Sequence, residues 1–126
     1  MNQDRKQCFD RARRVVVKVG SGVLTHENGL NIRIVRSLSR QICDLIDQGK
    51  EVILVTSGAM AAGLAKVGLA RRPDQIPQRQ AVAAVGQAGL ILEYEKAFGR
   101  HGRKVAQILL TSDGLSNRKR YLNARN

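Results

Sequence analysis

Two short apolar segments, each followed by small residues, constrain the fold of this chain most strongly. The first segment, Arg14–Val19, is rich in valine and leads into Gly20-Ser21-Gly22. The second, Glu51–Val55, leads into Thr56-Ser57-Gly58-Ala59. Short β-branched runs bounded by glycine are typical of buried parallel strands. We therefore predict two strands, each ending in a loop whose backbone a ligand can approach closely.

The segment between these strands has the spacing of an amphipathic helix. Apolar residues recur every three or four positions from Ile32 to Ile46, Asn31 stands at the N-cap position, and Gly49 follows the last turn. A strand, a helix and a strand in this order form a right-handed βαβ unit with parallel strands. Because ligands bind at the carboxyl ends of such strands, the sequence predicts that Lys18–Ser21 lies beside Thr56–Ala59.

Beyond this unit the sequence predicts more helices and a third strand. The expected elements are a helix over Gly58–Val67, a helix over Gln78–Phe98 with Val85 and Leu92 among its apolar positions, a strand over Lys104–Leu110, and a basic helix capped by Ser116. Glycine favours close helix packing, so we expect Gly86 and Gly89 at an interface between subunits.

Length and composition exclude several classes of protein. The 126 residues fit one domain. They contain no apolar run long enough to span a membrane, and Met1–Arg14 lack the apolar core of a secretory signal. Cys8 and Cys43 form no metal-binding pattern, so we expect reduced thiols in a cytoplasmic protein.

The formal net charge of +12 has two interpretations. One is a surface that binds nucleic acid, and the other is a set of solvated basic residues on part of a larger protein. The basic residues are scattered along the chain, and aromatic residues that could stack on bases are few. This pattern favours solvated residues and makes nucleic acid an unlikely partner.

Lys18 is the strongest candidate for chemistry. No complete dinucleotide-binding, P-loop or nucleophile-elbow motif occurs, and His26 and His101 have no acidic partner at triad or metal spacing. A lysine inside a central strand is costly unless its ammonium reaches a polar site, and phosphate suits a lysine point charge. Ser57 is compatible with ligand binding and, equally, with capping the next helix.

Four motifs resemble the glutamate 5-kinase family, within the amino acid kinase superfamily. They occur in the family's order at similar spacing and are Val16–Ser21, Val55–Gly63, Ala83–Gln87 and Leu122–Arg125. The resemblance implies an α/β fold, a three-layer αβα sandwich with a mainly parallel central sheet. Residues 14–126 would form the amino-terminal, amino-acid-binding part of that fold, after a flexible basic arm over residues 1–13.

The resemblance also implies a reaction and a set of site residues. The γ-phosphoryl group of ATP, with Mg²⁺, would pass to the side-chain carboxylate of L-glutamate in the first step of proline biosynthesis. Lys18 would be catalytic and contact the nucleotide phosphates together with Gly20 and Ser21. Ser57, Gly58 and Ala59 would bind glutamate. The carboxylate is itself the nucleophile, so no strong general base is required.

The resemblance leaves further expectations and alternatives. Gly22 stands where the family often has serine, and the family's nucleotide-binding half would lie beyond Asn126, so we expect a fragment that is inactive alone. A homo-oligomer with proline as a feedback inhibitor is expected. The alternatives are an aspartate, acetylglutamate or uridylate kinase, against which Thr56–Ala59 argues, and a non-catalytic basic module that binds RNA.

Overall fold

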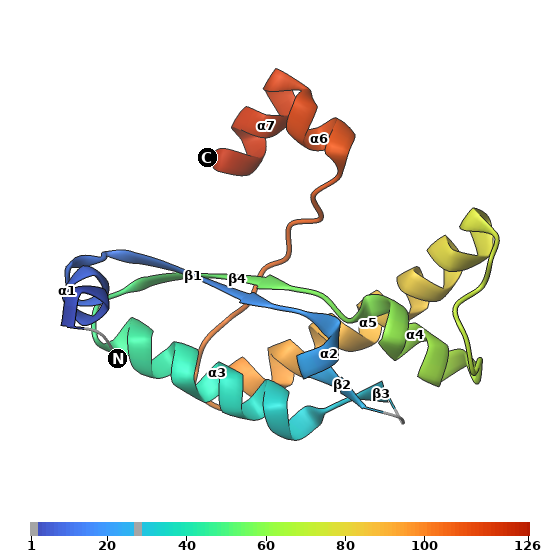
Figure 1. Ribbon diagram of the computed structural model, residues 1–126, viewed down its shortest axis with the longest axis horizontal. Coiled ribbons are helices and arrows are strands. Elements are labelled where there is room, and N and C mark those ends of the chain that lie inside the picture. The colour runs from blue at the N-terminus through green and yellow to red at the C-terminus, as the bar shows by residue number, and fades with distance from the viewer. Residues whose placement is uncertain (1–2, 27–28) are drawn as a thin grey trace.

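The computed structural model, which describes residues 3–26 and 29–126, is built around a βαβ unit (Figure 1). Its elements are β1 (Arg14–Val19), α3 (Ile32–Asp47) and β4 (Glu51–Thr56). The two strands pair in parallel, from Arg14 opposite Glu51 to Val19 opposite Thr56. Both predicted strands and their parallel pairing are confirmed, and β4 extends one residue further than expected.

Helix α3 begins and ends as the sequence predicts. The Asn31 side chain accepts a hydrogen bond from the Ile34 backbone N–H at 3.3 Å, which caps the first turn. After the last turn Gly49 adopts a φ of 84°, a left-handed conformation that favours glycine. Val35 and Ile42 on one face of the helix are buried, because they pack into the core beneath the sheet.

Helices α4 (Ala59–Val67) and α5 (Ile76–Gly99) form a hairpin in which the two backbones touch. A Cβ added to Gly63 would lie 1.9 Å from the carbonyl oxygen of Val82, and one added to Gly86 would lie 1.8 Å from that of Ala59. The predicted close packing at Gly86 is confirmed, but its partner is α4 of the same chain rather than another subunit. Gly89 has no atom within 4 Å of an added Cβ.

The core lies on one side of the sheet. Helices α3 and α5 cover this side, where Leu90, Tyr94 and Phe98 of α5 meet the buried face of α3 (Figure 1). On the other side Val16, Ile53 and Val55 are exposed. The α/β class is therefore confirmed. The second helical layer of a three-layer sandwich is not seen packed on the sheet in residues 3–26 and 29–126.

A short loop region connects β1 to α3. It consists of α2 (Ser21–Leu24) and an antiparallel pair of two-residue strands, β2 (Thr25–His26) and β3 (Gly29–Leu30). Leu24 is fully buried, and a Cβ added to Gly29 would lie 3.0 Å from the Cβ of Ala65 on α4. This loop region is thus anchored on α4 and on the core.

The amino-terminal segment differs from the predicted flexible arm over residues 1–13. Residues 1 and 2 lie outside the described part, and α1 (Gln3–Arg11) is a helix with no buried residue. The Lys50 ammonium donates hydrogen bonds to the carbonyls of Phe9, Asp10 and Ala12 at 2.9, 3.2 and 2.8 Å. The last carbonyls of a helix lack a full set of backbone partners, and the Phe9 carbonyl has one from the Ala12 N–H at 3.2 Å. A lysine that the fold brings close therefore stabilises the helix end.

The predicted third strand is wrong. Residues 103–111 have no regular structure, and in the described ranges β4 pairs with β1 alone. A strand exists only when a neighbour pairs with its backbone, and Lys104–Leu110 lies along an open groove of about 950 Å³ beside β4 without pairing. Leu109 is 71% exposed as a result.

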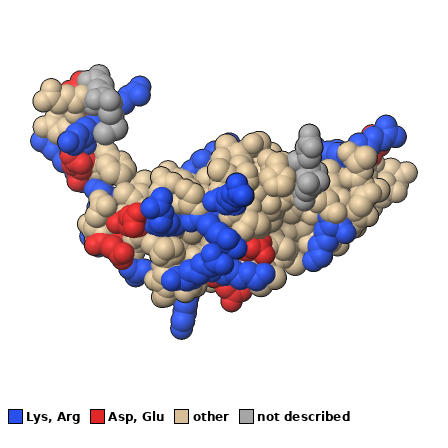
Figure 2. Space-filling model, turned by 90° about the horizontal axis from the view of Figure 1, so that it is seen from below, with Lys and Arg blue, Asp and Glu red and all other residues tan. Residues whose placement is uncertain are grey.

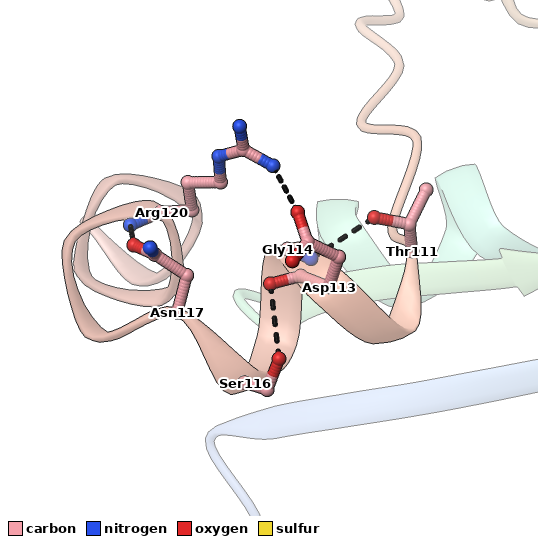
Figure 3. Close-up of polar contacts among 6 residues, drawn as sticks. All are labelled: Thr111, Asp113, Gly114, Ser116, Asn117 and Arg120. Atoms are coloured by element: carbon pink, nitrogen blue, oxygen red, sulfur yellow. Dashed lines mark hydrogen bonds and ion pairs between the residues drawn. The ribbon is translucent and has the colours of Figure 1, made fainter.

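Two short helices follow, α6 (Ser112–Ser116) and α7 (Arg118–Arg125). Ser116 does not cap α7, because its hydroxyl donates to the Asp113 carbonyl at 3.2 Å (Figure 3). Asn117 is the cap instead, and its side chain accepts a hydrogen bond from the Arg120 N–H at 3.1 Å. The predicted basic helix is confirmed, with its cap one residue later than expected.

Candidate functional site

The carboxyl ends of β1 and β4 meet, as the sequence predicts. Lys18 is paired with Val55, and the Ser57 backbone N–H donates to the carbonyl oxygen of Val19 at 3.1 Å. This last hydrogen bond continues the pairing one residue past the end of β4. The two predicted loops therefore leave the sheet side by side, although more than thirty residues separate them in the sequence.

Lys18 lies on the exposed face of the sheet, not inside it. The prediction that it occupies a costly buried position is wrong, because in the described ranges no second helical layer covers the face of the sheet on which Lys18 lies. The Lys18 side chain nevertheless folds back over the following loop, so that its Nζ atom lies 3.7 Å from a Cβ added to Gly20. Within residues 3–26 and 29–126 no carboxylate pairs with this ammonium. It is therefore available to an anion.

Gly20 and Ser21 form the turn beneath this ammonium. The carbonyl of Gly20 accepts hydrogen bonds from the N–H groups of Val23 and Leu24 at 3.2 and 3.4 Å, which starts α2. Gly20 precedes α2 without a side-chain cap, and Ser21 is exposed. The structure thus brings Lys18, Gly20 and Ser21 together at one strand end.

Ser57, Gly58 and Ala59 form the turn at the end of β4. Gly58 has a φ of 110°, which a residue with a side chain adopts only with strain. Gly58, not Ser57, occupies the N-cap position of α4, so the alternative interpretation of Ser57 as a helix cap is wrong. Ser57 is exposed, and its hydroxyl has no hydrogen bond among the described residues.

Sequence reasoning missed one residue near this turn, Tyr94. It is 3% exposed on α5, and its hydroxyl oxygen lies 2.8 Å from Thr56 Oγ1. Burial raises the pKa of the Tyr94 phenol, which the hydrogen bond with Thr56 only partly offsets. The spacing of Leu90, Tyr94 and Phe98 indicates a buried helix face, whereas the expected Leu92 is 45% exposed.

The donor set suits phosphate better than a metal ion. In the described ranges no group of three or more His, Cys, Asp or Glu side chains could hold a metal. An ammonium beside glycine-rich backbone is typical of an anion site. These residues therefore fit the phosphate portion of a nucleotide, and they supply no ligand cage for Mg²⁺.

Basic side chains gather on the face that α3 presents to solvent (Figure 2). Arg33, Arg36 and Arg40 are exposed along this helix, and none of them forms an ion pair within the described part of the chain. Helix α3 lies on the opposite side of the sheet from Lys18 (Figure 1). The row of arginines is therefore separate from the candidate site.

Comparisons with known proteins agree with this architecture. The profile of the amino acid kinase family matches residues 13–126. The chain therefore belongs to the amino acid kinase family. Similar proteins include the glutamate 5-kinase of Syntrophotalea carbinolica, which is 51% identical over 122 residues, covering 97% of this chain and 33% of the relative.

Two further relatives carry the same name. The glutamate 5-kinase of Citrifermentans bemidjiense is 53% identical over 96% of this chain and 33% of its own length. That of Caldanaerobacter subterraneus subsp. tengcongensis is 56% identical over 87% of this chain and 30% of its own length. The chain thus spans about a third of the curated relatives that it matches, and it resembles their amino-terminal part.

The helices were also compared with the length and hydropathy that a membrane span requires. In residues 3–26 and 29–126 no helix meets both requirements.

Proposed function

We propose that this chain is the amino-acid-binding part of a glutamate 5-kinase, which transfers the γ-phosphoryl group of ATP to the side-chain carboxylate of L-glutamate. A carboxylate oxygen would attack the γ-phosphorus, the bond to the β-phosphate oxygen would break, and ADP and glutamyl 5-phosphate would leave. The proposed step belongs to proline biosynthesis. The observation that carries the proposal is the hydrogen bond from the Ser57 N–H to the Val19 carbonyl. It holds the turn after Lys18 beside the turn that contains Ser57.

Lys18 has the charge that the phosphoryl group requires. Phosphoryl transfer depends mainly on positioning and on offsetting negative charge at the phosphate oxygens. The ammonium lies close over Gly20 and has no carboxylate partner in the described ranges, so its charge is not neutralised before substrate arrives. Gly20 and Ser21 would line the phosphates below it.

The second loop fits a carboxylate substrate. The Ser57 hydroxyl is exposed next to the start of α4 at Ala59, where helix N–H groups have no partner within the helix. The positive end of a helix favours a negative group, and a free hydroxyl can donate to a carboxylate. Ser57, Gly58 and Ala59 would therefore hold glutamate, and the relatives' name favours glutamate over aspartate, acetylglutamate or uridylate substrates.

The cofactors and partners follow from the family. ATP would bring Mg²⁺ on its phosphates, because Mg²⁺ in kinases is bound largely by the substrate phosphates. The unpaired cysteines Cys8 and Cys43 support a cytoplasmic location. A homo-oligomer and inhibition by proline stay predictions from the family resemblance.

Steady-state kinetics on the complete natural polypeptide that carries this sequence test the proposal. Lys18→Ala is expected to lower kcat by about two orders of magnitude with little change in Tm, because an exposed charge is lost at the transition state. Ser57→Ala is expected to raise the KM for glutamate by about tenfold and to leave the KM for ATP almost unchanged. Lys66→Ala, which removes an exposed lysine from α4, is the control.

Other outcomes would reject these assignments. A normal kcat for Lys18→Ala with a lowered Tm would make Lys18 structural. An equal loss of affinity for both substrates in Ser57→Ala would place this loop on the nucleotide. The second candidate function, a basic RNA-binding module, is favoured by the arginine row on α3. It would be supported by salt-sensitive RNA binding that is lost when Arg33, Arg36 and Arg40 become glutamine.

A further inference from the structure

A buried tyrosine reaches the proposed glutamate loop through a threonine. Tyr94 is held in the core, where its ring lies 6.2 Å from that of Phe98 at a tilt of 31°. Its hydroxyl oxygen is 2.8 Å from Thr56 Oγ1, on the last residue of β4. Thr56 Oγ1 is in turn 3.2 Å from the carbonyl oxygen of Ser57. A chain of two hydrogen bonds therefore connects α5 to the residue that we assign to glutamate.

The direction of these hydrogen bonds follows from the proton count. The Ser57 carbonyl can only accept, and the Thr56 hydroxyl has one proton to donate. When both bonds form, Thr56 donates to Ser57 and accepts from Tyr94, so Tyr94 is the first donor. The raised pKa of the phenol keeps this proton in place at neutral pH.

The backbone of Ser57 is held from its other side as well. Its N–H donates to the Val19 carbonyl at 3.1 Å, and the next residue, Gly58, is fixed in a left-handed conformation. The backbone of Ser57 thus contacts β1 directly and α5 through Thr56, whereas its hydroxyl stays exposed. This arrangement fixes the backbone that carries the hydroxyl and leaves the hydroxyl itself exposed.

We propose that Tyr94 is a positioning residue for the amino-acid substrate, and that it acts through Thr56 to orient Ser57; this inference rests on the proposed function. Packing alone does not explain why residue 94 carries a phenolic hydroxyl. Phe98, one turn along on the same helix face, fills the core without a hydroxyl. A buried hydroxyl is costly unless it is hydrogen-bonded, and its one partner in the described residues is Thr56.

The test compares Tyr94→Phe with Tyr121→Phe in the complete natural polypeptide. Both variants lose one phenolic oxygen, but Tyr121 is 44% exposed on α7. Tyr94→Phe is expected to raise the KM for glutamate about three- to tenfold, with the KM for ATP unchanged and normal kcat. Tyr121→Phe should change none of these values. Hydrogen exchange at the Ser57 amide should quicken in Tyr94→Phe and not in Tyr121→Phe.

Thr56 variants show whether the two hydroxyls act as one unit. Thr56→Val should reproduce the effect of Tyr94→Phe, whereas Thr56→Ser keeps the hydroxyl and should retain wild-type behaviour. The double variant Tyr94→Phe with Thr56→Val should have no higher KM for glutamate than Thr56→Val alone. A purely structural role would lower Tm without this pattern. Equal increases in the KM for glutamate and ATP, or additive effects of the two substitutions, would overturn the inference.

The exchange measurement separates this inference from the proposed function. If the wild-type protein does not phosphorylate glutamate, the proposed function fails together with the substrate assignment of Tyr94. Unchanged exchange at the Ser57 amide in Tyr94→Phe would overturn the positioning role even in a fully active kinase.

Discussion

Two regions of this chain, residues 14–99 and residues 104–126, contain similar apolar side chains. The first region packs many of them into the core, whereas the second leaves them largely exposed to solvent. Leu90 of α5 is 2% exposed in the core, whereas Leu109 in the segment after α5 is 71% exposed. Helices α4 and α5 are packed with their backbones in contact, whereas α6 and α7 stand away from the sheet in Figure 1. The difference teaches that apolar residues organise a segment only when another element offers a surface for them to cover.

The largest expected effect concerns the hairpin that holds the packed region together. Gly86→Ala should destabilise the protein by about 4 kcal/mol, above the usual range for overpacking, because the added Cβ meets backbone atoms that cannot rotate away. Gly89→Ala in the same helix should stabilise it by up to about 1 kcal/mol, because alanine favours helix and the added Cβ meets no neighbour.

Denaturant unfolding of the complete natural polypeptide measures both glycine variants. If the two substitutions had the same effect, contact between the α4 and α5 backbones would not be what holds the hairpin together.

The second prediction compares the two regions directly through the same substitution. Leu90→Ala should cost about 3 kcal/mol, because it removes a fully packed side chain and leaves a cavity. Leu109→Ala should change stability by less than about 0.5 kcal/mol, because the side chain is already in water. Thermal unfolding followed by circular dichroism checks the pair. A large loss for Leu109→Ala would mean that residues 104–110 bury themselves in solution.

The smallest expected effect concerns the exposed ion pairs at the start of the strands. Arg14 donates to Glu51 Oε2 at 2.9 and 2.6 Å, and Arg13 lies 3.0 Å from Oε1. The hydrogen bond from Arg14, with the charges of both arginines, lowers the pKa of Glu51. A lowered carboxyl pKa contributes stability above the ordinary value of about 4.3, and this stability is lost as pH falls through the lowered value.

Comparing wild type with Glu51→Gln across this pH range tests that assignment. Wild type should be slightly more stable at neutral pH, and the difference should vanish on acidification or in high salt, because exposed pairs are weak and screened. Asp113→Asn is the control from residues 104–126, where Asp113 pairs with Arg120 within one local turn region. A pH-independent difference for Glu51→Gln would show that the charge plays no part.

Several structural features could be predicted because local pattern determines them. The valine runs, the Asn31 cap and the glycine after α3 were sufficient for the βαβ unit, since parallel strands joined by a helix have one common arrangement. The meeting of Lys18–Ser21 with Thr56–Ala59 followed from that topology. The strand over Lys104–Leu110 could not be judged in the same way, because a strand depends on a neighbour that the local sequence does not specify.

The sequence by itself determined the α/β class, the two strand ends and the candidate loops, because hydrophobic spacing and glycine act over a few residues. Only the tertiary structure decided that Lys18 is exposed, that Gly86 contacts α4, and that Lys50 holds the end of α1. It also placed Tyr94 against Thr56, residues that lie 38 positions apart. Such contacts depend on which surfaces the packed elements bring together, and no local pattern encodes that choice.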